Sequence, residues 1–235
     1  MAENQHSEHI VHRFDQELEA LRDEVLRMGS KVEEQIDNAV RALTEGDRAL
    51  AENTIREDHA VNSMEVTADE RAVSLLARRT PAASDLRFVM TAIKTITDLE
   101  RMGDEAEKIA RMAREMQGPG RGQRFSALPA MGEAVRNETR HALDCLASMD
   151  AEAALRIHAE DEKVDEMFEG IFRELMTYMM EDPRTISSTI DILFVAKALE
   201  RIGDHSKNIT EYVIYMVHGK DVRHTDVDRL DLDNS

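Results

Sequence analysis

A duplicated hexapeptide constrains this sequence more than any other feature. Leu99–Asp104 reads L-E-R-M-G-D and, 100 residues later, Leu199–Asp204 reads L-E-R-I-G-D. A second pair of segments, 58–64 and 161–167, shares the pattern D-x-x-V-[ND]-x-M at an offset of 103 residues. Two matches at nearly the same offset indicate that one structural unit occurs twice in the chain.

The residues around both copies are typical of long helices. Aromatic residues make up only 4% of the 235 residues, tryptophan is absent, and there are four prolines and ten glycines. Apolar residues recur every three or four positions in six segments, which is the spacing of amphipathic helices. The turn residues that separate these segments predict helices that begin near Ile10, Asp47, Thr80-Pro81, Ser126, Asp150 and Asp182-Pro183.

The sequence therefore predicts an all-α fold of two tandem, pseudo-symmetric three-helix bundles, six helices in total. The first repeat spans residues 1–118 and the second spans 119–235, with the Gly118-Pro119-Gly120 linker between them. Gly46 and Gly219 are expected to end helices in the left-handed conformation. Residues 1–9 are predicted to be loose, and the acidic tail from Lys220 to Ser235 is predicted to be disordered.

The net charge of −18 argues against two classes of partner. Nucleic acids and anionic lipid surfaces both attract clusters of lysine and arginine, so no nucleic acid partner and no membrane insertion are expected. No apolar run reaches the roughly 18 residues that cross a bilayer. The polar segment Met1–Ile10 lacks a secretory signal, and Cys145 is the only cysteine. A cytoplasmic location is the expectation.

Paired carboxylates are the candidate functional groups. Glu100 and Asp104 are four residues apart, as are Glu200 and Asp204, so each pair shares one helix face and its like charges repel. One helix earlier, Asp58 precedes Asn62, and the second repeat carries two further acids, Asp161 and Asp165. Carboxylate oxygens on facing helices suit hard divalent or trivalent cations such as magnesium, manganese or iron.

A structural explanation competes with this metal hypothesis. Arg101 and Arg201 could neutralise the acids as surface ion pairs, but the repetition of both acidic pairs favours bound cations. Gly103 and Gly203 would let a neighbouring helix or a ligand approach closely. The Asp85-Leu86-Arg87 triplet is not duplicated, and it could form an ion pair with another helix or a recognition patch.

Catalytic motifs are absent from the sequence. It contains no glycine-rich phosphate loop, no Ser/His/Asp constellation and no H-E-x-x-H motif. The Glu-x-x-His motif does not occur in the pairing on two helices that carboxylate-bridged di-iron bundles require. The sequence does not predict an enzyme.

Three features of the sequence resemble the PhoU family over about residues 10–218. They are the doubled L-E-R-[MI]-G-D, the D-x-x-x-[DN] segments, and the Thr-Pro and Asp-Leu-Arg residues that precede the first copy. The resemblance implies six helices in two three-helix bundles, a homodimer and multinuclear metal clusters. It also implies a cytoplasmic negative regulator of the phosphate regulon, whose partners are the ATPase subunit of the phosphate ABC transporter and a phosphate-sensing histidine kinase. The metal ligands it implies are Asp58, Glu100, Asp104, Asp161, Asp165, Glu200 and Asp204. Asn62 departs from the acidic residue of the family pattern, which predicts unequal occupancy of the two sites.

Three hypotheses follow from these observations. The chain is a PhoU-like signalling adaptor, a carboxylate-bridged metalloenzyme, or a metal-free helical scaffold whose acidic faces are solvated. Repression of phosphate-starvation genes tests the first, turnover of a phosphoester or an oxidant tests the second, and metal retained by the purified protein tests the third.

Overall fold

The computed structural model describes residues 2–78, 81–116, 127–160, 162–220 and 222, with the side chains of 2–13, 158–160 and 162 not described. These residues form helices and contain no strand, so the all-α prediction is confirmed. In chain order the helices are α1 (Ala2–Glu45), α2 (Arg48–Arg78), α3 (Ala83–Glu115), α4 (Ala127–Ser148), α5 (Ala151–Glu160), α6 (Glu162–Glu181), the 3₁₀ turn η2 (Pro183–Thr185) and α7 (Ile186–His218).

The α1–α2 and α4–α5 corners use the same capping device. Gly46 has φ +70° and ends α1 in the left-handed region, and the Asp47 carboxylate accepts a hydrogen bond from the Leu50 amide at 2.9 Å. In the second repeat Met149 has φ +56°, and the Asp150 carboxylate accepts from the Ala153 amide at 2.9 Å. The predicted caps Asp47 and Asp150 are thus confirmed, and so is Gly219, with φ +70° at the end of α7.

The two proline-containing corners differ from each other. Asp182 accepts a hydrogen bond from the Arg184 amide and Pro183 opens η2, so this corner begins with a 3₁₀ turn before α7. The first corner was predicted to start its helix at Thr80-Pro81, but α3 begins at Ala83 with Ala82 as the capping residue. Ala82 makes no side-chain cap, so capping chemistry does not set the start of α3, and Thr80 lies outside the described residues.

Two further boundaries differ from the prediction. The first helix starts at Ala2 and not near Ile10. The predicted fifth helix is divided into α5 and α6 at residue 161, which lies outside the described residues, so seven α-helices are described in place of six. The linker Gly118–Gly120 and most of the tail also lie outside the described residues.

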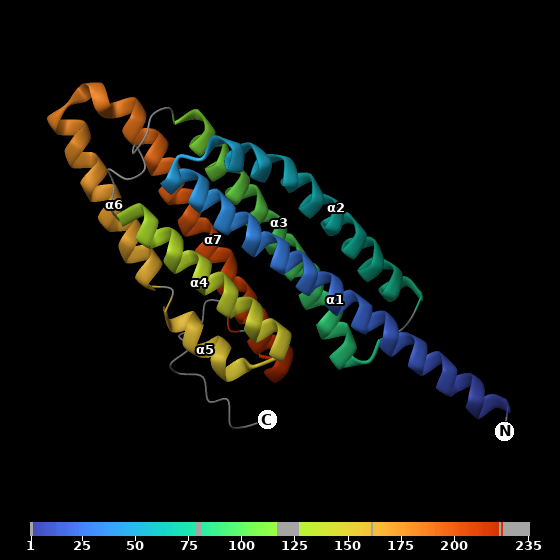
Figure 1. Cartoon of the computed structure of the whole chain (residues 1–235). Coiled ribbons are helices and arrows are strands. Elements are labelled where there is room, and N and C mark those ends of the chain that lie inside the picture. The colour runs from blue at the N-terminus through green and yellow to red at the C-terminus, as the bar shows by residue number, and fades with distance from the viewer. Residues whose placement is uncertain (1, 79–80, 117–126, 161, 221, 223–235) are drawn as a thin grey trace.

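The helices form two long bundles that lie side by side (Figure 1). Helices α1, α2 and α3 pack together, as do α4, α5, α6 and α7, and the two groups meet where α3 contacts α7 and α1 contacts α4. One apolar core runs through both, and its largest fully buried side chains include Met28, Ile36, Leu99, Met131 and Leu199. No helix in the described part of the chain has the length and apolar character needed to cross a membrane.

The packing of α1 against α4 reveals an internal two-fold relation. A Cβ atom on Gly29 would lie 2.6 Å from Cδ2 of Leu143, and one on Gly132 would lie 2.7 Å from Cγ1 of Val40. Gly29 and Gly132 are 103 residues apart, as are Val40 and Leu143. Each repeat therefore offers a glycine to the branched side chain of the other, and the backbones approach closely at both points.

Charged side chains along the same α1–α4 contact are complementary. Arg136 Nη1 lies 2.6 Å from Asp37 Oδ1, and Arg140 Nε lies 2.7 Å from Glu33 Oε1. Glu33 and Arg136 occupy equivalent positions of the two repeats, as do Asp37 and Arg140. The first repeat supplies the acids and the second supplies the bases, so this interface favours pairing of unlike repeats.

Polar contacts also join α3 to α7. His205 Nδ1 lies 2.8 Å from Oδ1 of the buried Asp98, and Arg201 donates to Glu105 at 2.9 Å. Arg201 of the second motif therefore pairs with Glu105 on the other repeat. The Arg87 guanidinium lies at the C-terminal end of α7, where Nη1 would be 3.4 Å from a Cβ on Gly219, and a cation is favourable at a helix C-terminus.

Candidate metal centre

The acidic face of the first repeat is built by α2 and α3. Asp58, Asn62 and Glu65 lie on α2 at a spacing of four and three residues, so they share one face of that helix. Glu100 and Asp104 lie one turn apart on α3, which packs against α2. Asp58 is buried, with 6% of its surface exposed, while Glu65, Glu100 and Asp104 are half-buried.

Two amide side chains hold the Asp58 carboxylate. Gln35 on α1 donates its Nε2 hydrogen to Asp58 Oδ1 at 3.0 Å, and Asn62 donates from Nδ2 to Oδ2 at 3.0 Å. Gln35 is 1% exposed. Within the described residues, its Oε1 atom and the Oδ1 atom of Asn62 have no hydrogen-bond partner. Because a buried carbonyl oxygen is costly without a partner, both atoms are suited to a cation or to a proton donor.

Gly103 brings α3 close to the helices that carry these amides. A Cβ atom at this position would lie 3.2 Å from Gln35 Oε1, 3.3 Å from Val61 Cγ1 and 3.7 Å from Asp58 Oδ1. The expectation that this glycine permits the close approach of a neighbouring helix is therefore confirmed for the first repeat. The backbone of Gly103 is helical and would accept any residue, so the limited space beside it, and not its φ angle, is what favours glycine here.

The acids of this face raise one another's pKa. Burial raises the pKa of Glu100, and the charges of Asp104 and Glu65 raise it further. Burial and then the Asp58 charge raise the pKa of Asp104. The pKa of Glu65 is raised by burial and by the charges of Asp69 and Asp104. Asp58, Glu65, Glu100 and Asp104 are thus close enough to influence one another's charge, and their role as metal ligands stays a prediction.

The second acidic face lies on α6 and α7. Asp165 on α6 and Asp204 on α7 are exposed, and Glu200 is half-buried with its carboxylate 2.5 Å from the Lys197 ammonium. Asp161 lies outside the described residues, so its place beside them stays a prediction. Among the described side chains, no group of three His, Cys, Asp or Glu residues surrounds a single point in the manner of a metal cage.

Sequence reasoning missed two members of the first face. Gln35 is an amide on a different helix from the motif residues, and Glu65 has no acidic equivalent, because Phe168 occupies its position in the second repeat. A sequence signal for Gln35 did exist. The 103-residue offset between the repeats pairs Gln35 with Glu138, an acidic residue that is buried in the structure. His205, which follows the second copy of the motif, contacts Asp98 of α3 and not the acids of the first face.

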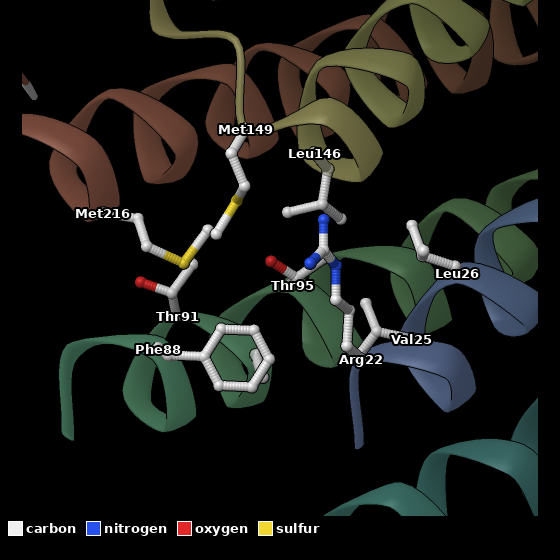
Figure 2. Close-up of a pocket in the computed structure, with 10 residues that line it drawn as sticks. Arg22, Val25, Leu26, Phe88, Thr91, Thr95, Leu146, Met149 and Met216 are labelled. Carbon is white, nitrogen blue, oxygen red and sulfur yellow. The ribbon is translucent and has the colours of Figure 1, made fainter. Parts of the chain in front are cut away.

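A separate apolar cavity lies between α1, α3, α4 and α7 (Figure 2). The space open to the centre of a water molecule is about 20 Å³, which is room for about one water. Phe88, Met149 and Met216 contribute to its wall, with Arg22 reaching across it in Figure 2. Arg22 donates to the Ala147 carbonyl at 2.5 Å, so its charge is directed to the end of α4. This cavity is far below the size of a cofactor site.

Comparisons with known proteins agree with this architecture. The PhoU domain profile matches the chain twice, over residues 25–113 and 128–213. This chain belongs to the PhoU family. The two matched ranges fall on the two repeats, one on α1–α3 and the other on α4–α7.

Two curated PhoU relatives match nearly the whole chain. The phosphate-specific transport system accessory protein PhoU of Escherichia coli K12 is 46% identical over 225 residues, which covers 96% of this chain and 93% of that protein. The homologue from Pseudomonas putida is also 46% identical, over 94% of this chain and 87% of that protein.

Solved PhoU structures share the fold. The crystal structure of PhoU from Pseudomonas aeruginosa has a TM-score of 0.83 and 44% identity, and covers 88% of this chain and all of that chain. The phosphate transport system regulatory protein PhoU from Streptococcus pneumoniae has a TM-score of 0.79 at 30% identity. Two PhoU-type bundles in tandem are therefore the architecture of this chain.

Proposed function

We propose that this chain is an accessory regulator of a phosphate-specific transport system. The observation that carries the proposal is the 46% identity to the E. coli accessory protein, spread over 96% of this chain and 93% of that protein. The aligned residues therefore extend over nearly the whole of both chains. The role is regulatory, with no catalytic step assigned to any residue.

The proposed regulator acts in the cytoplasm as a homodimer. It contacts the ATPase subunit of the phosphate ABC transporter and a phosphate-sensing histidine kinase, and it represses the phosphate regulon when phosphate is abundant. Exposed apolar residues support a docking role, because Leu86 and Met90 at the start of α3 have equivalents in Ile186 and Ile190 at the start of α7. Each repeat thus exposes apolar side chains at the same place, where partners could bind.

Bound cations are part of this proposal. The ligands proposed are Asp58, Glu100 and Asp104 in the first repeat, with Asp161, Asp165, Glu200 and Asp204 in the second. In the first repeat the donors are oxygens and include the unpartnered carbonyl of Gln35, which is the chemistry that a hard cation prefers, although no three of the described acids surround a single point. When bound, a cation would neutralise charges that raise one another's pKa in its absence.

Gene replacement tests the regulatory role. We expect this chain to restore repression in an E. coli strain that lacks its own PhoU, measured with a reporter driven by a phosphate-starvation promoter in high-phosphate medium. An empty vector and the E. coli gene are the two controls. A reporter that stays fully active despite normal levels of this protein would contradict the proposed function.

A further inference from the structure

The hairpin formed by α6 and α7 exposes large apolar side chains near its corner. Three of them follow one line of each helix at a spacing of four residues, and together these six residues form the hairpin surface: Phe172, Met176, Met180, Ile186, Ile190 and Phe194. Met180 is 73% exposed and Phe194 is 57% exposed. A contiguous apolar surface on a protein in water is typical of a site that another molecule covers.

The two rows of the hairpin surface adjoin each other. Helices α6 and α7 run in opposite directions and are joined only by η2 (Figure 1). Lys197 Nζ lies 5.3 Å from the centre of the Phe168 ring, and this contact sets the alignment of the two helices. Phe172 follows Phe168 by one turn, with 6.5 Å between the ring centres, and Phe194 lies one turn before Lys197. The alignment therefore places Phe172 near Phe194, on the same side of the hairpin.

The first repeat lacks the aromatic part of this surface. Asp69 and Lys94 occupy the positions that Phe172 and Phe194 occupy in the second repeat. The first repeat thus forms the same type of bundle with charged residues at these positions, so helix packing does not require the two phenylalanines. Because the chain has only six phenylalanines, two exposed ones at a single place indicate a role that belongs to the second repeat.

The charges around the hairpin surface are mainly acidic. Exposed acids precede it, lie at its corner and flank its α7 row, namely Glu166, Glu169, Glu181 and Asp191. The bases between residues 170 and 200 are each paired with an acid, Arg173 with Glu169, Arg184 with Asp182 and Lys197 with Glu200. The whole chain carries a net charge of −18. A cationic partner is therefore favoured at this surface, and an anionic lipid surface is disfavoured.

The shape of the surface suits a helix. Each row spans eight residues, which is about 12 Å along a helix axis, or roughly two turns of a partner helix. Rows of side chains four residues apart form the ridges against which another helix packs. Unbranched methionines such as Met176 and Met180 adapt to the shape of the side chains that they contact. Basic residues at the margins of such a helix would lie near Glu169, Glu181 and Asp191.

We propose that the hairpin surface binds a basic amphipathic helix of a partner protein. This inference rests on the proposed regulatory role, in which the chain contacts other proteins. It assigns one contact to the second repeat and states the chemistry of the segment that binds there.

Fluorescence anisotropy with a labelled model peptide tests the proposal in the full-length chain. The probe is a helical peptide of about 18 residues made of leucine and lysine, with leucines at helical spacing, and the same peptide with glutamate in place of lysine is the charge control. We expect Phe172→Gln/Phe194→Gln to weaken binding of the lysine peptide by about tenfold or more, because exposed aromatic anchors dominate such interfaces. The glutamate peptide should bind neither protein.

Val66→Gln/Val73→Gln is the matched control. It removes two apolar side chains of α2 that are 56% and 61% exposed, and it should bind the lysine peptide as the wild type does. Circular dichroism and the Tm of each variant establish that the compared proteins are folded.

Three results would overturn the proposal. The first is a wild type that does not bind the lysine peptide, and the second is equal binding by the wild type and Phe172→Gln/Phe194→Gln. The third is a wild-type dimer that becomes a monomer in this variant in sedimentation experiments, because a second copy of the chain would then cover the surface.

The phosphate-starvation reporter separates this inference from the proposed function. A chain that binds the lysine peptide through Phe172 and Phe194 but does not restore repression would support the hairpin surface and contradict the regulatory role. A chain that restores repression, and whose Phe172→Gln/Phe194→Gln variant represses and binds the peptide equally well, would contradict this inference alone.

Discussion

Asp58 and Glu100 lie on facing helices, yet their carboxylates are stabilised by different means. Asp58 accepts two amide hydrogen bonds, whereas Glu100 accepts none within the described residues and carries a raised pKa. Burial is the largest cause of that shift, followed by the charges of Asp104 and Glu65. In the metal-free protein, the charge of Glu100 therefore opposes folding at neutral pH.

Glu100→Gln should make the metal-free protein more stable at pH 7. A raised folded-state pKa means that the folded protein holds this proton more tightly than the unfolded chain does, so stability is lost as pH rises through the folded pKa. The gain from the substitution should disappear below the ordinary glutamate value of 4.5, where both states are protonated. Urea unfolding of chelator-treated protein between pH 4 and 7 measures this difference.

Excess Mn²⁺ should reverse the sign of that effect. Under the proposed metal binding, the wild type should gain stability from a cation that binds the folded state, and Glu100→Gln should lose part of this gain. The exposed control Glu70→Gln should behave like the wild type in both conditions. A Glu100→Gln protein that is less stable than the wild type without metal would show that this carboxylate makes a stabilising contact instead.

The helices themselves were predictable where local chemistry sets their ends. Asp47, Asp150 and Gly219 act through hydrogen bonds or a positive φ within a few residues, and the sequence predicted all three. Met149 was not predicted, because a left-handed methionine has no local signal; its conformation follows from the repeat relation to Gly46. The predicted fifth helix corresponds to α5 and α6, which lie on either side of residue 161, outside the described residues.

The candidate site was predictable only along single helices. The four-residue spacing of Glu100 and Asp104 revealed a shared face, but Gln35 reaches that face from α1, which no spacing within α2 or α3 could indicate. The Asp85-Leu86-Arg87 triplet is a similar case. Its arginine lies against the end of α7, more than a hundred residues away in the sequence, and this tertiary contact supports the structural interpretation of that residue.

At the scale of helix packing, Gly132 tests how closely α1 and α4 must approach. We expect Gly132→Ala to destabilise the protein by about 1–3 kcal/mol, because the new Cβ would lie 2.7 Å and 3.1 Å from the two methyl groups of Val40, a side chain with little freedom at χ1. Val40→Ala in the same chain should recover much of this loss. A double-mutant cycle from urea unfolding measures the coupling, and additive effects of the two substitutions would contradict the proposed clash.

For the whole molecule, the central question is what makes the two repeats pair with each other in one chain. Equivalent positions along the α1–α4 contact carry acids in the first repeat, Glu33 and Asp37, and bases in the second, Arg136 and Arg140. Two copies of the first repeat placed in this arrangement would bring four acids together, and two copies of the second would bring four arginines together. The apolar contacts do not distinguish like from unlike repeats, because each repeat places a glycine against a branched apolar side chain of the other.

Reversing one side of this charge pattern should therefore weaken the contact between the repeats. Arg136→Glu/Arg140→Glu places four acids along the α1–α4 contact, and we expect a loss of about 1–2 kcal/mol in the free energy of unfolding, given roughly 0.2–1 kcal/mol for each partly exposed ion pair plus the new repulsion. Adding Glu33→Arg/Asp37→Arg restores opposite charges in the reversed order and should recover most of the loss. Urea unfolding at 0.05 M and 1 M NaCl measures it, and the difference between the charge-reversed variant and the wild type should shrink at high salt, where the Debye length is about 3 Å. If the fourfold variant is no more stable than the double variant, the arginines act through their packed side-chain stems and not through charge.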